Sequence, residues 1–423
     1  MKRRNNRVLE FLGFFPFPDP VEDVGPPPDG GQGWVQVLVA HLVLFNTWGY
    51  FNSYGLFIDY YASAFPGTTL SALSWAGSTQ IFLLLLISTL SGRVFDAGYY
   101  RLTLLVGSIL QVVAIFMTSL ASQYWQLFMA QGICGGIGAG IIYVPTVSCV
   151  ATYFAKRRAL AVSFATSGTA TGGVVFPIIA QQLLPRIGFG WTVRVMGFVV
   201  LFNCLVVFAL GRPRIPRRSS GKFVELEAWK EAPYSLFTVG VFLCLWAVYI
   251  GYDYINIYAS SVLGAPDSTA LVILLILNAM GLPGRLVPAL VSDAYLGPFQ
   301  TLTPIVISSG IMYFCWIAVK SIKGLYVFSI FFGLVNGGVQ GMILAGLPSL
   351  TTDLSKMGTR SGMVLTVVSF ATLTGPPLAG ALIHEDAGGF LYLQIWGGLS
   401  MLIGAGFLLA ARRAASSRSK TEP

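Results

Sequence analysis

Arg285 has the clearest chemical potential in this sequence, because it lies inside a long apolar run, residues 269–291. Asp293 follows it eight residues later, about 12 Å along a helix at 1.5 Å per residue. An ionised guanidinium at that depth is costly unless it faces water or an anion, so it indicates a functional site. Its planar fork suits a carboxylate. The alternatives are a structural ion pair and a side chain that extends to the membrane surface.

Further polar side chains occur within apolar runs and are candidates for the same cavity. Besides Arg285, we expect three of them to bind substrate: Asn52, Asn278 and Tyr143. Asn46 and Gln80 also lie at membrane depth. Polar side chains in such helices can also simply hydrogen-bond between helices.

Two residues are candidates for proton coupling, His41 and Asp253. Histidine changes charge near neutral pH, but hydrogen bonding between helices is the simpler interpretation of His41. Asp253 lies near the end of an apolar run, where it is either a proton-binding carboxylate or an interfacial residue. The adjacent Tyr249, Tyr252 and Tyr254 are typical of the aromatic belt at a membrane surface.

Two charged loops are candidates for gating. The segment GRVFDAGYYR, residues 92–101, contains Gly92, Asp96 and Arg101. The segment AKRR, residues 155–158, contains Lys156, Arg157 and Arg158. A carboxylate in such a loop can pair with a base or cap a helix N-terminus, which would latch one state of a conformational cycle. The alternatives are an ordinary solvated turn and basic residues that only set the membrane topology.

Little in the sequence indicates enzymatic chemistry. His41 and His384 are the two histidines and are far apart, and the five cysteines form no CxxC pair. The glycine run at 132–140 lacks the spacing of a dinucleotide site, and no GxxxxGK[ST] loop occurs, which disfavours an ATP-driven pump. We therefore expect no cofactor, no metal and no enzymatic activity.

The elements that position these residues are membrane-spanning helices. The chain is 55% hydrophobic and only 10% charged, with a mean hydropathy of +0.72, whereas soluble domains carry roughly 25% charge. Apolar runs long enough to cross a bilayer occupy residues 34–57, 73–90, 102–120, 125–150, 159–184, 192–210, 234–254, 269–291, 302–319, 325–347, 362–383 and 392–411. Since backbone polar groups in lipid must bond internally and no alternating strand pattern occurs, the sequence predicts an all-α polytopic membrane protein.

The charges divide this chain into segments. We predict an N-terminal tail at 1–33, six-helix bundles at 34–210 and 234–411, a charged linker at 211–233 and a C-terminal tail at 412–423. Of the 26 Lys and Arg residues, 21 fall on the side of both tails and the linker, and four on the opposite side. This asymmetry predicts cytoplasmic termini and explains the net charge of +9 without nucleic acid. Glycine-rich runs in the fourth and tenth predicted spans suggest that the two halves are repeats, although glycine is common in membrane helices.

Several motifs resemble one transporter family. DGGQGW at 29–34, YFAKRRALAVSFATSGTATGG at 153–173, the loop at 92–101 and GPPLAG at 375–380 are similar to the fungal monocarboxylate-transporter-like branch of the major facilitator superfamily. The resemblance implies the major facilitator fold, with 12 transmembrane helices in two six-helix bundles, a central cavity and alternating access, often coupled to a proton. Arg285 falls where that family's arginine binds the substrate carboxylate. Asn52 and Gly281 stand where animal relatives have a lysine and an aspartate, so a lactate-and-proton mechanism does not transfer directly.

We therefore expect a plasma-membrane secondary transporter for a small organic anion or a metabolite with a carboxylate, embedded in the lipid bilayer, with Arg285 as the anion anchor and protons as a candidate coupling ion. The first alternative is an exporter of a fungal secondary metabolite. A non-transporting nutrient sensor and an integral-membrane enzyme are further alternatives. The sensor is disfavoured by the short predicted C-terminal tail, and the enzyme by the absence of a catalytic cluster at membrane depth.

Overall fold

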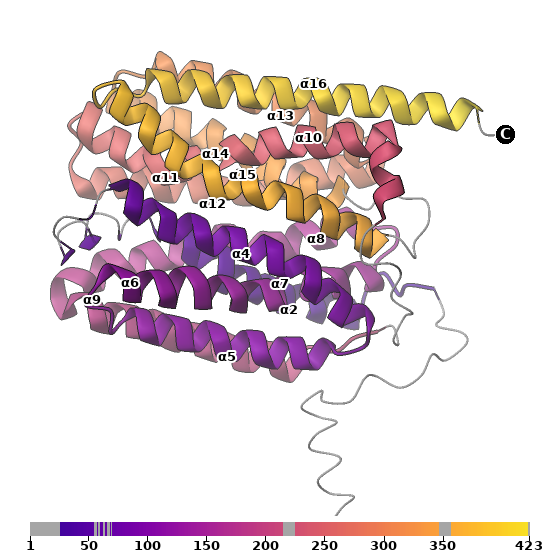
Figure 1. The fold of residues 1–423 in the computed structure, drawn as a ribbon, viewed down its shortest axis with the longest axis horizontal. Coiled ribbons are helices and arrows are strands. Elements are labelled where there is room, and N and C mark those ends of the chain that lie inside the picture. Colours follow the sequence, from indigo (N-terminus) through magenta and orange to yellow (C-terminus); the bar gives the residue numbers. More distant parts are fainter. Residues whose placement is uncertain are drawn as a thin grey trace, which may run out of the picture.

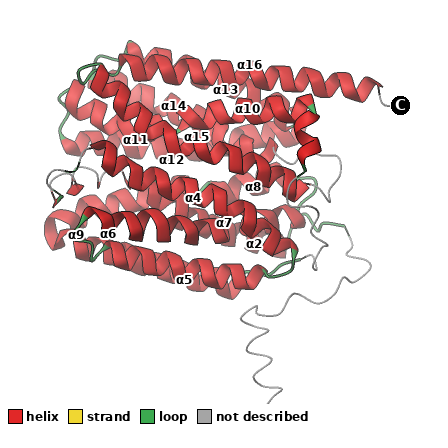
Figure 2. Cartoon of the chain, in the orientation of Figure 1, coloured by secondary structure: helices red, strands yellow, loops and turns green. Residues whose placement is uncertain are grey.

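A computed structural model describes residues 26–54, 57, 60–61, 64–65, 68, 70–214, 225–346 and 357–421. The ordered elements in these ranges are all helices (Figure 2). All five predicted segments fall partly outside the described residues. These parts are 1–25 of the N-terminal tail, several positions between 55 and 69 of the first bundle, 215–224 of the linker, 347–356 of the second bundle and 422–423 of the C-terminal tail. The predicted segment boundaries therefore stay predictions.

The helices follow the apolar runs closely. The N-terminal half contains α2 (Gln32–Leu44), η1 (Phe45–Gly49), α4 (Leu70–Asp96), α5 (Tyr100–Thr118), α6 (Tyr124–Leu127), η2 (Phe128–Gly135), α7 (Gly136–Tyr153), α8 (Arg158–Thr166) and α9 (Gly168–Leu210). The C-terminal half contains η3 (Leu226–Lys230), α10 (Ala232–Val248), α11 (Ile250–Ile257), η4 (Tyr258–Val262), α12 (Asp267–Val291), η5 (Ser292–Leu296), α13 (Pro298–Ile317), α14 (Ile322–Gly346), α15 (Met357–Glu385) and α16 (Leu391–Thr421).

Ten helical segments of the described residues are long and apolar enough to cross a membrane. The longest, Arg158–Leu210, has 53 residues, about 80 Å of helix against a hydrocarbon core of about 30 Å. It contains a break at Gly188, where a positive φ of 72° turns the chain, so it forms two spans. With α2 and η1 as the first span, the described residues form twelve spans, which agrees with the predicted fold class. The break lies between the fifth and sixth predicted runs.

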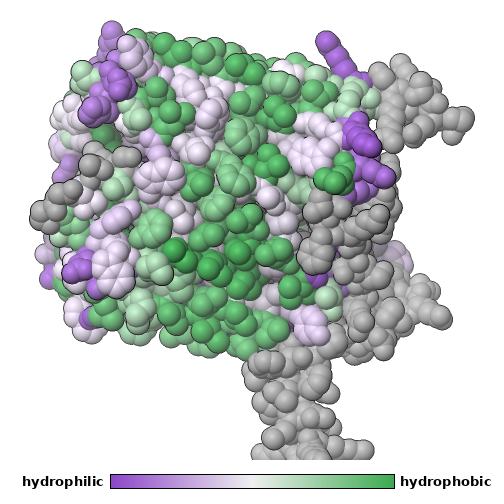
Figure 3. Space-filling model, in the orientation of Figure 1, coloured by the Kyte–Doolittle hydropathy of each residue, from purple (hydrophilic) through white to green (hydrophobic). Residues whose placement is uncertain are grey.

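The two halves lie side by side (Figure 1). Helix α4 packs against α15, and α8 and α9 pack against α12. We call the end where α2 begins and η3 lies the linker end, and the opposite end the far end. A broad hydrophobic band covers the visible surface between the two ends (Figure 3). Exposed aromatic side chains lie towards both ends: Trp34 and Tyr295 at the linker end, and Trp125 and Trp191 at the far end.

Glycines bring corresponding helices together in each half. A Cβ atom at Gly136 of α7 would lie 2.8 Å from the carbonyl oxygen of Gln80 in α4. A Cβ atom at Gly337 of α14 would lie 2.6 Å from the carbonyl oxygen of Gly281 in α12. In both halves the fourth span therefore packs backbone to backbone against the second.

Candidate functional site between the two halves

A cavity of about 50 Å³ lies between the two halves. Eight spans contribute to its wall. The lining residues are Leu44, Trp48, Leu85, Tyr143, Thr166, Thr169, Val241, Leu245, Tyr249, Arg285, Gln340, Ile343, Leu344, Val364, Leu365 and Val368. Arg285 is the one charged residue among them, and none is acidic.

Arg285 is 2% exposed and points into this cavity from α12. Its Nη1 donates to the carbonyl oxygen of Gly281 at 3.0 Å, and its Nη2 donates to Oε1 of Gln340 at 2.6 Å. Its buried Nε has no acceptor among the described residues. The guanidinium is therefore neither neutralised by an acid in the cavity wall nor extended to the membrane surface, and it keeps donors for a further acceptor.

Three aromatic rings line the cavity near the guanidinium. Trp48 of the N-terminal half stacks on Tyr249 of the C-terminal half, with ring centroids 5.5 Å apart and an interplanar angle of 13°. Tyr143 meets Trp48 edge-on at 6.0 Å. Tyr143 and Tyr249 are close enough to interact with the charge of Arg285. The stack joins the two halves directly beside the cation.

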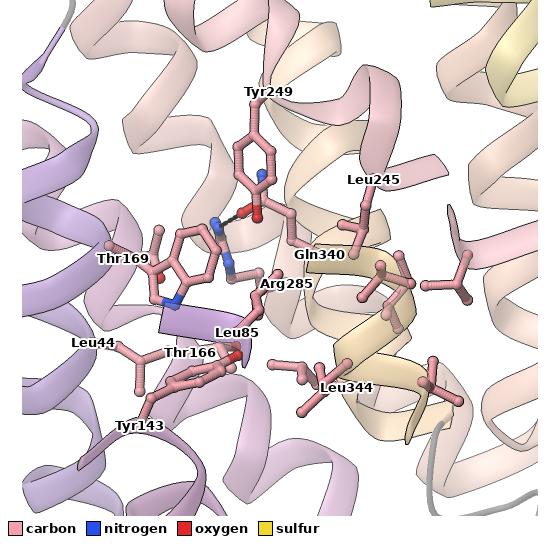
Figure 4. Close-up of a pocket in the computed structure, with 16 residues that line it drawn as sticks. Leu44, Leu85, Tyr143, Thr166, Thr169, Leu245, Tyr249, Arg285, Gln340 and Leu344 are labelled. Atoms are coloured by element: carbon pink, nitrogen blue, oxygen red, sulfur yellow. Dashed lines mark hydrogen bonds between the residues drawn. The ribbon is translucent and has the colours of Figure 1, made fainter. Parts of the chain in front are cut away.

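The cavity separates polar from apolar groups. In Figure 4, the polar ends of Arg285, Gln340 and Tyr249 gather on one side, while Leu245 and Leu344 extend on another. The wall contains no nucleophile paired with a base. This arrangement can bind a solute that has one anionic group and an apolar body.

Asn52 and Asn278, both predicted to bind substrate, contact each other on the far-end side of this cavity. The Asn52 amide Nδ2 donates to Oδ1 of Asn278 at 2.9 Å, which joins the first and eighth spans across the two halves. Neither lines the cavity. Gly173 permits this contact, because a Cβ atom there would lie 2.4 Å from Oδ1 of Asn278.

At the linker end, Asp293 joins the two halves. Its carboxylate, from η5, accepts the backbone N–H of Ala159 at 3.3 Å and of Leu160 at 2.9 Å. These N–H groups belong to the first turn of α8, where an anion is stabilised by unpaired donors and the helix dipole. The hydroxyl of Thr89 also donates to the carbonyl oxygen of Gly362 at 2.9 Å. Contacts between the halves therefore lie on both sides of the cavity.

Asp29 binds the loop that precedes α8. Its Oδ1 accepts the backbone N–H groups of Ala155 at 2.8 Å and Lys156 at 3.0 Å, and that of Arg157 at 3.5 Å. Partial desolvation raises the pKa of the Asp29 carboxyl. The three hydrogen bonds and the positive charge of Lys156 together lower this pKa by more, so it lies below the ordinary value of an aspartate. The motifs DGGQGW and YFAKRR thus meet in space. The side chains of Lys156 and Arg157 are exposed.

The other predicted gating residues lie mainly within the N-terminal half. Arg158 donates from Nε to the carbonyl oxygen of Phe154 at 3.3 Å. Arg101 donates to the carbonyl oxygen of Phe208 at 3.3 Å and lies over its ring. Gly92 is located near the end of α4, and Asp96 ends that helix. Their roles in gating stay predictions.

The structure places the proton-coupling candidates in different surroundings. Both ring nitrogens of His41 lie within hydrogen-bonding distance of α8 and α9 groups, Nδ1 at 3.1 Å from the carbonyl oxygen of Phe164 and Nε2 at 3.0 Å from Thr171 Oγ1. Asp253 lies in α11, away from the cavity wall.

The expectation that three tyrosines form an interfacial belt is wrong. Tyr249, Tyr252 and Tyr254 are each at most 7% exposed. They are buried because α11 faces neighbouring helices, which hydropathy alone does not show.

Two lining residues were missed from the sequence. Gln340 is a polar residue inside the tenth apolar run, so the rule that singled out Asn278 could have found it. Trp48 gave no such signal, because aromatic residues are common throughout this chain. Among the described residues, no three His, Cys, Asp or Glu side chains gather to hold a metal ion.

Comparisons with known proteins agree with this fold. The family model described as Major Facilitator Superfamily matches residues 38–376. An MFS-type transporter of Gibberella zeae is 43% identical over 93% of this chain and 90% of its own length. The aspyridones efflux protein of Emericella nidulans is 36% identical over 92% of this chain and 79% of its own length. The agnestins efflux protein of Paecilomyces divaricatus is 33% identical over 89% of this chain and 87% of its own length.

Proposed function

The chain belongs to the Major Facilitator Superfamily and is a multi-pass membrane transporter, and we propose that it exports an acidic metabolite with a largely apolar body. The observation that carries the proposal is the buried Arg285, which faces a cavity with no acidic side chain in its wall. A buried cation without a counter-ion is costly, and an anionic cargo would supply the missing charge.

The cargo is proposed to bind Arg285 through a carboxylate or a similarly acidic oxygen. Such a group can accept from the unpaired Nε and can replace Gln340 as the acceptor for Nη2, giving a two-point bond. The aliphatic part of the wall, which includes Leu245 and Leu344, would hold an apolar body.

The size of the cavity supports alternating access. At about 50 Å³ it has room for only a few water molecules, since each needs at least about 10–15 Å³. A metabolite therefore requires the halves to separate. In this proposal, opening at the far end breaks the Asn52–Asn278 bond and the Trp48–Tyr249 stack. Opening at the linker end breaks the contact of Asp293 with α8.

Export is favoured over uptake by the relatives. Two of them are named as efflux proteins for aspyridones and agnestins. The motifs at 29–34 and 153–173 support a place in the monocarboxylate-transporter-like branch, but the residues at positions 52 and 281 set this chain apart from lactate carriers.

We also propose that the linker end is cytoplasmic and that the protein acts at the plasma membrane. The support for the orientation is the excess of Lys and Arg on that side, 21 against four.

The proposal is tested by comparing the metabolites of cells that have and lack the protein. We expect an acidic compound to accumulate inside cells that lack it, and we expect purified protein in sealed vesicles to move that compound. If no organic acid is retained and none moves in the vesicles, with or without a pH gradient, the proposal is refuted.

A further inference from the structure

Asp253 is a membrane-embedded carboxylate that the Arg285 cavity does not use. It lies in α11, one helical turn beyond Tyr249 towards the far end, about 6 Å along the axis. Asp253 as a whole is partly buried, and its Oδ2 is fully buried and accepts no hydrogen bond from the described residues. Tyr249, four residues before Asp253, lines the Arg285 cavity and stacks on Trp48.

The groups facing Asp253 are mainly tyrosines. Tyr54 of the N-terminal half, Tyr249 and Tyr254 of the same span, and Tyr313 of α13 are close enough to interact with its charge. Three of these hydroxyls donate to carbonyl oxygens elsewhere, Tyr54 to Leu73, Tyr254 to Pro376 and Tyr313 to Ala247. Since Tyr54 belongs to the other half, Asp253 lies at the interface that separates when the far end opens.

Asp253 forms no salt bridge with the described cations. Helices α12 and α15 also pack against α11 and carry Arg285, Arg360 and His384. Arg285 bonds to Gly281 and Gln340, and Arg360 forms its ion pairs with acids of the linker, Glu225 and Glu231. The far-end stretch 55–69 contains no Lys, Arg or His in its sequence. Within the part of the chain that the structure describes, the carboxyl group therefore has no paired cation to stabilise its ionised form while the interface is closed.

An unpaired carboxylate in a low-dielectric interior takes up a proton, because the neutral acid costs far less to bury. Water that enters between the halves stabilises the anion and accepts the proton. We propose that Asp253 is the proton-binding group that couples this transporter to a pH gradient, loading a proton from water when the far end is open and carrying it neutral through the closed state. This inference rests on the proposed function.

The protonation step is testable without a cargo. In purified wild-type protein at neutral pH, infrared difference spectroscopy during a pH titration is expected to show the carbonyl stretch of a protonated carboxylic acid. The band should be absent in Asp253→Asn and present in Asp267→Asn, which alters an exposed aspartate at the start of α12. The same band in both variants, or no such band in the wild type, would overturn the inference.

Transport supplies a second readout. The vesicles are loaded with the metabolite that accumulates in cells lacking the protein. We expect the rate of transport driven by a pH gradient to be at least about tenfold lower in Asp253→Asn than in wild type. The rate of metabolite exchange at equal pH on both sides should stay within about twofold of wild type. Asp253→Glu should restore part of the pH-driven transport. Unchanged pH-driven transport in Asp253→Asn refutes the coupling role, as does equal loss of exchange. If the wild-type protein exchanges the metabolite but does not respond to a pH gradient, the coupling role is refuted and the proposed function is retained. If the wild-type protein transports no metabolite at all, the proposed function itself is refuted.

Discussion

Replacing Gln340 with Glu would change one polar atom beside the proposed anion site. Oε1 of Gln340 already lies 2.6 Å from Nη2 of Arg285, so a glutamate in the same rotamer places a carboxylate directly against the guanidinium. The variant supplies internally the negative charge that the cargo is proposed to bring. If Arg285 is the anion anchor, cargo affinity must fall although no cargo contact has been truncated.

The expected size of the effect follows from the charge pair. Opposite unit charges 4 Å apart attract by about 4 kcal/mol at an effective dielectric constant near 20, and burying a further charge offsets part of this attraction. The cargo would compete with an attraction of about 1.4–4 kcal/mol, which corresponds to a loss of about 10- to 1,000-fold in affinity. The thermal stability of Gln340→Glu should equal or exceed that of wild type, because a neutral hydrogen bond becomes a charge-assisted one.

The assay measures the affinity of the retained metabolite for purified protein by calorimetry, together with the melting temperature. Gln123→Glu, at an exposed position before α6, controls for an added negative charge. Wild-type affinity in a well-folded Gln340→Glu protein would refute the role of Arg285. A lower melting temperature in that variant alone would show that the pair is not formed as the structure predicts.

Two further predictions concern the contacts on either side of the cavity. Gly173→Ala should hold the far end apart, because the added Cβ atom would lie 2.4 Å from Oδ1 of Asn278, whereas Gly406→Ala, with open space around it, should have no effect. Distances between spin labels on the far-end loops of the two halves would measure this, and equal distances in both variants would contradict it. Asp293→Ala should open the linker end about 2- to 30-fold more often, corresponding to about 0.5–2 kcal/mol for a lost helix cap. Spin labels at the linker end would show this, and a wild-type distance distribution would count against the latch.

Arg285 and the twelve spans could be predicted because each depends on local properties of the sequence. A run of apolar residues fixes a membrane helix whatever its neighbours are, and a charge inside such a run is unusual enough to indicate function. Even the turn between the fifth and sixth spans, at Gly188, fell between the two predicted runs.

The partners of these residues could not be predicted, because they come from helices far apart in the sequence. Asn52 and Asn278 were both identified as polar residues at membrane depth, but their bond to each other joins positions 226 residues apart. The burial of Tyr249 depends on which face of the seventh span meets the first. Hydrophobic periodicity cannot show this, because in a membrane the lipid-facing side of a helix is as apolar as its packed side.

Asp29 and Asp293 both hold the segment around AKRR through peptide N–H groups, which every residue except proline carries. The identities of the side chains at positions 156–158 are therefore unconstrained by these bonds. A transporter built this way can change the charge it presents to its surroundings, and so adapt to other lipids or neighbouring proteins, while the clasp between its halves stays intact. A proline at position 160 would be the exception, since it removes the N–H that lies closest to the Asp293 carboxylate.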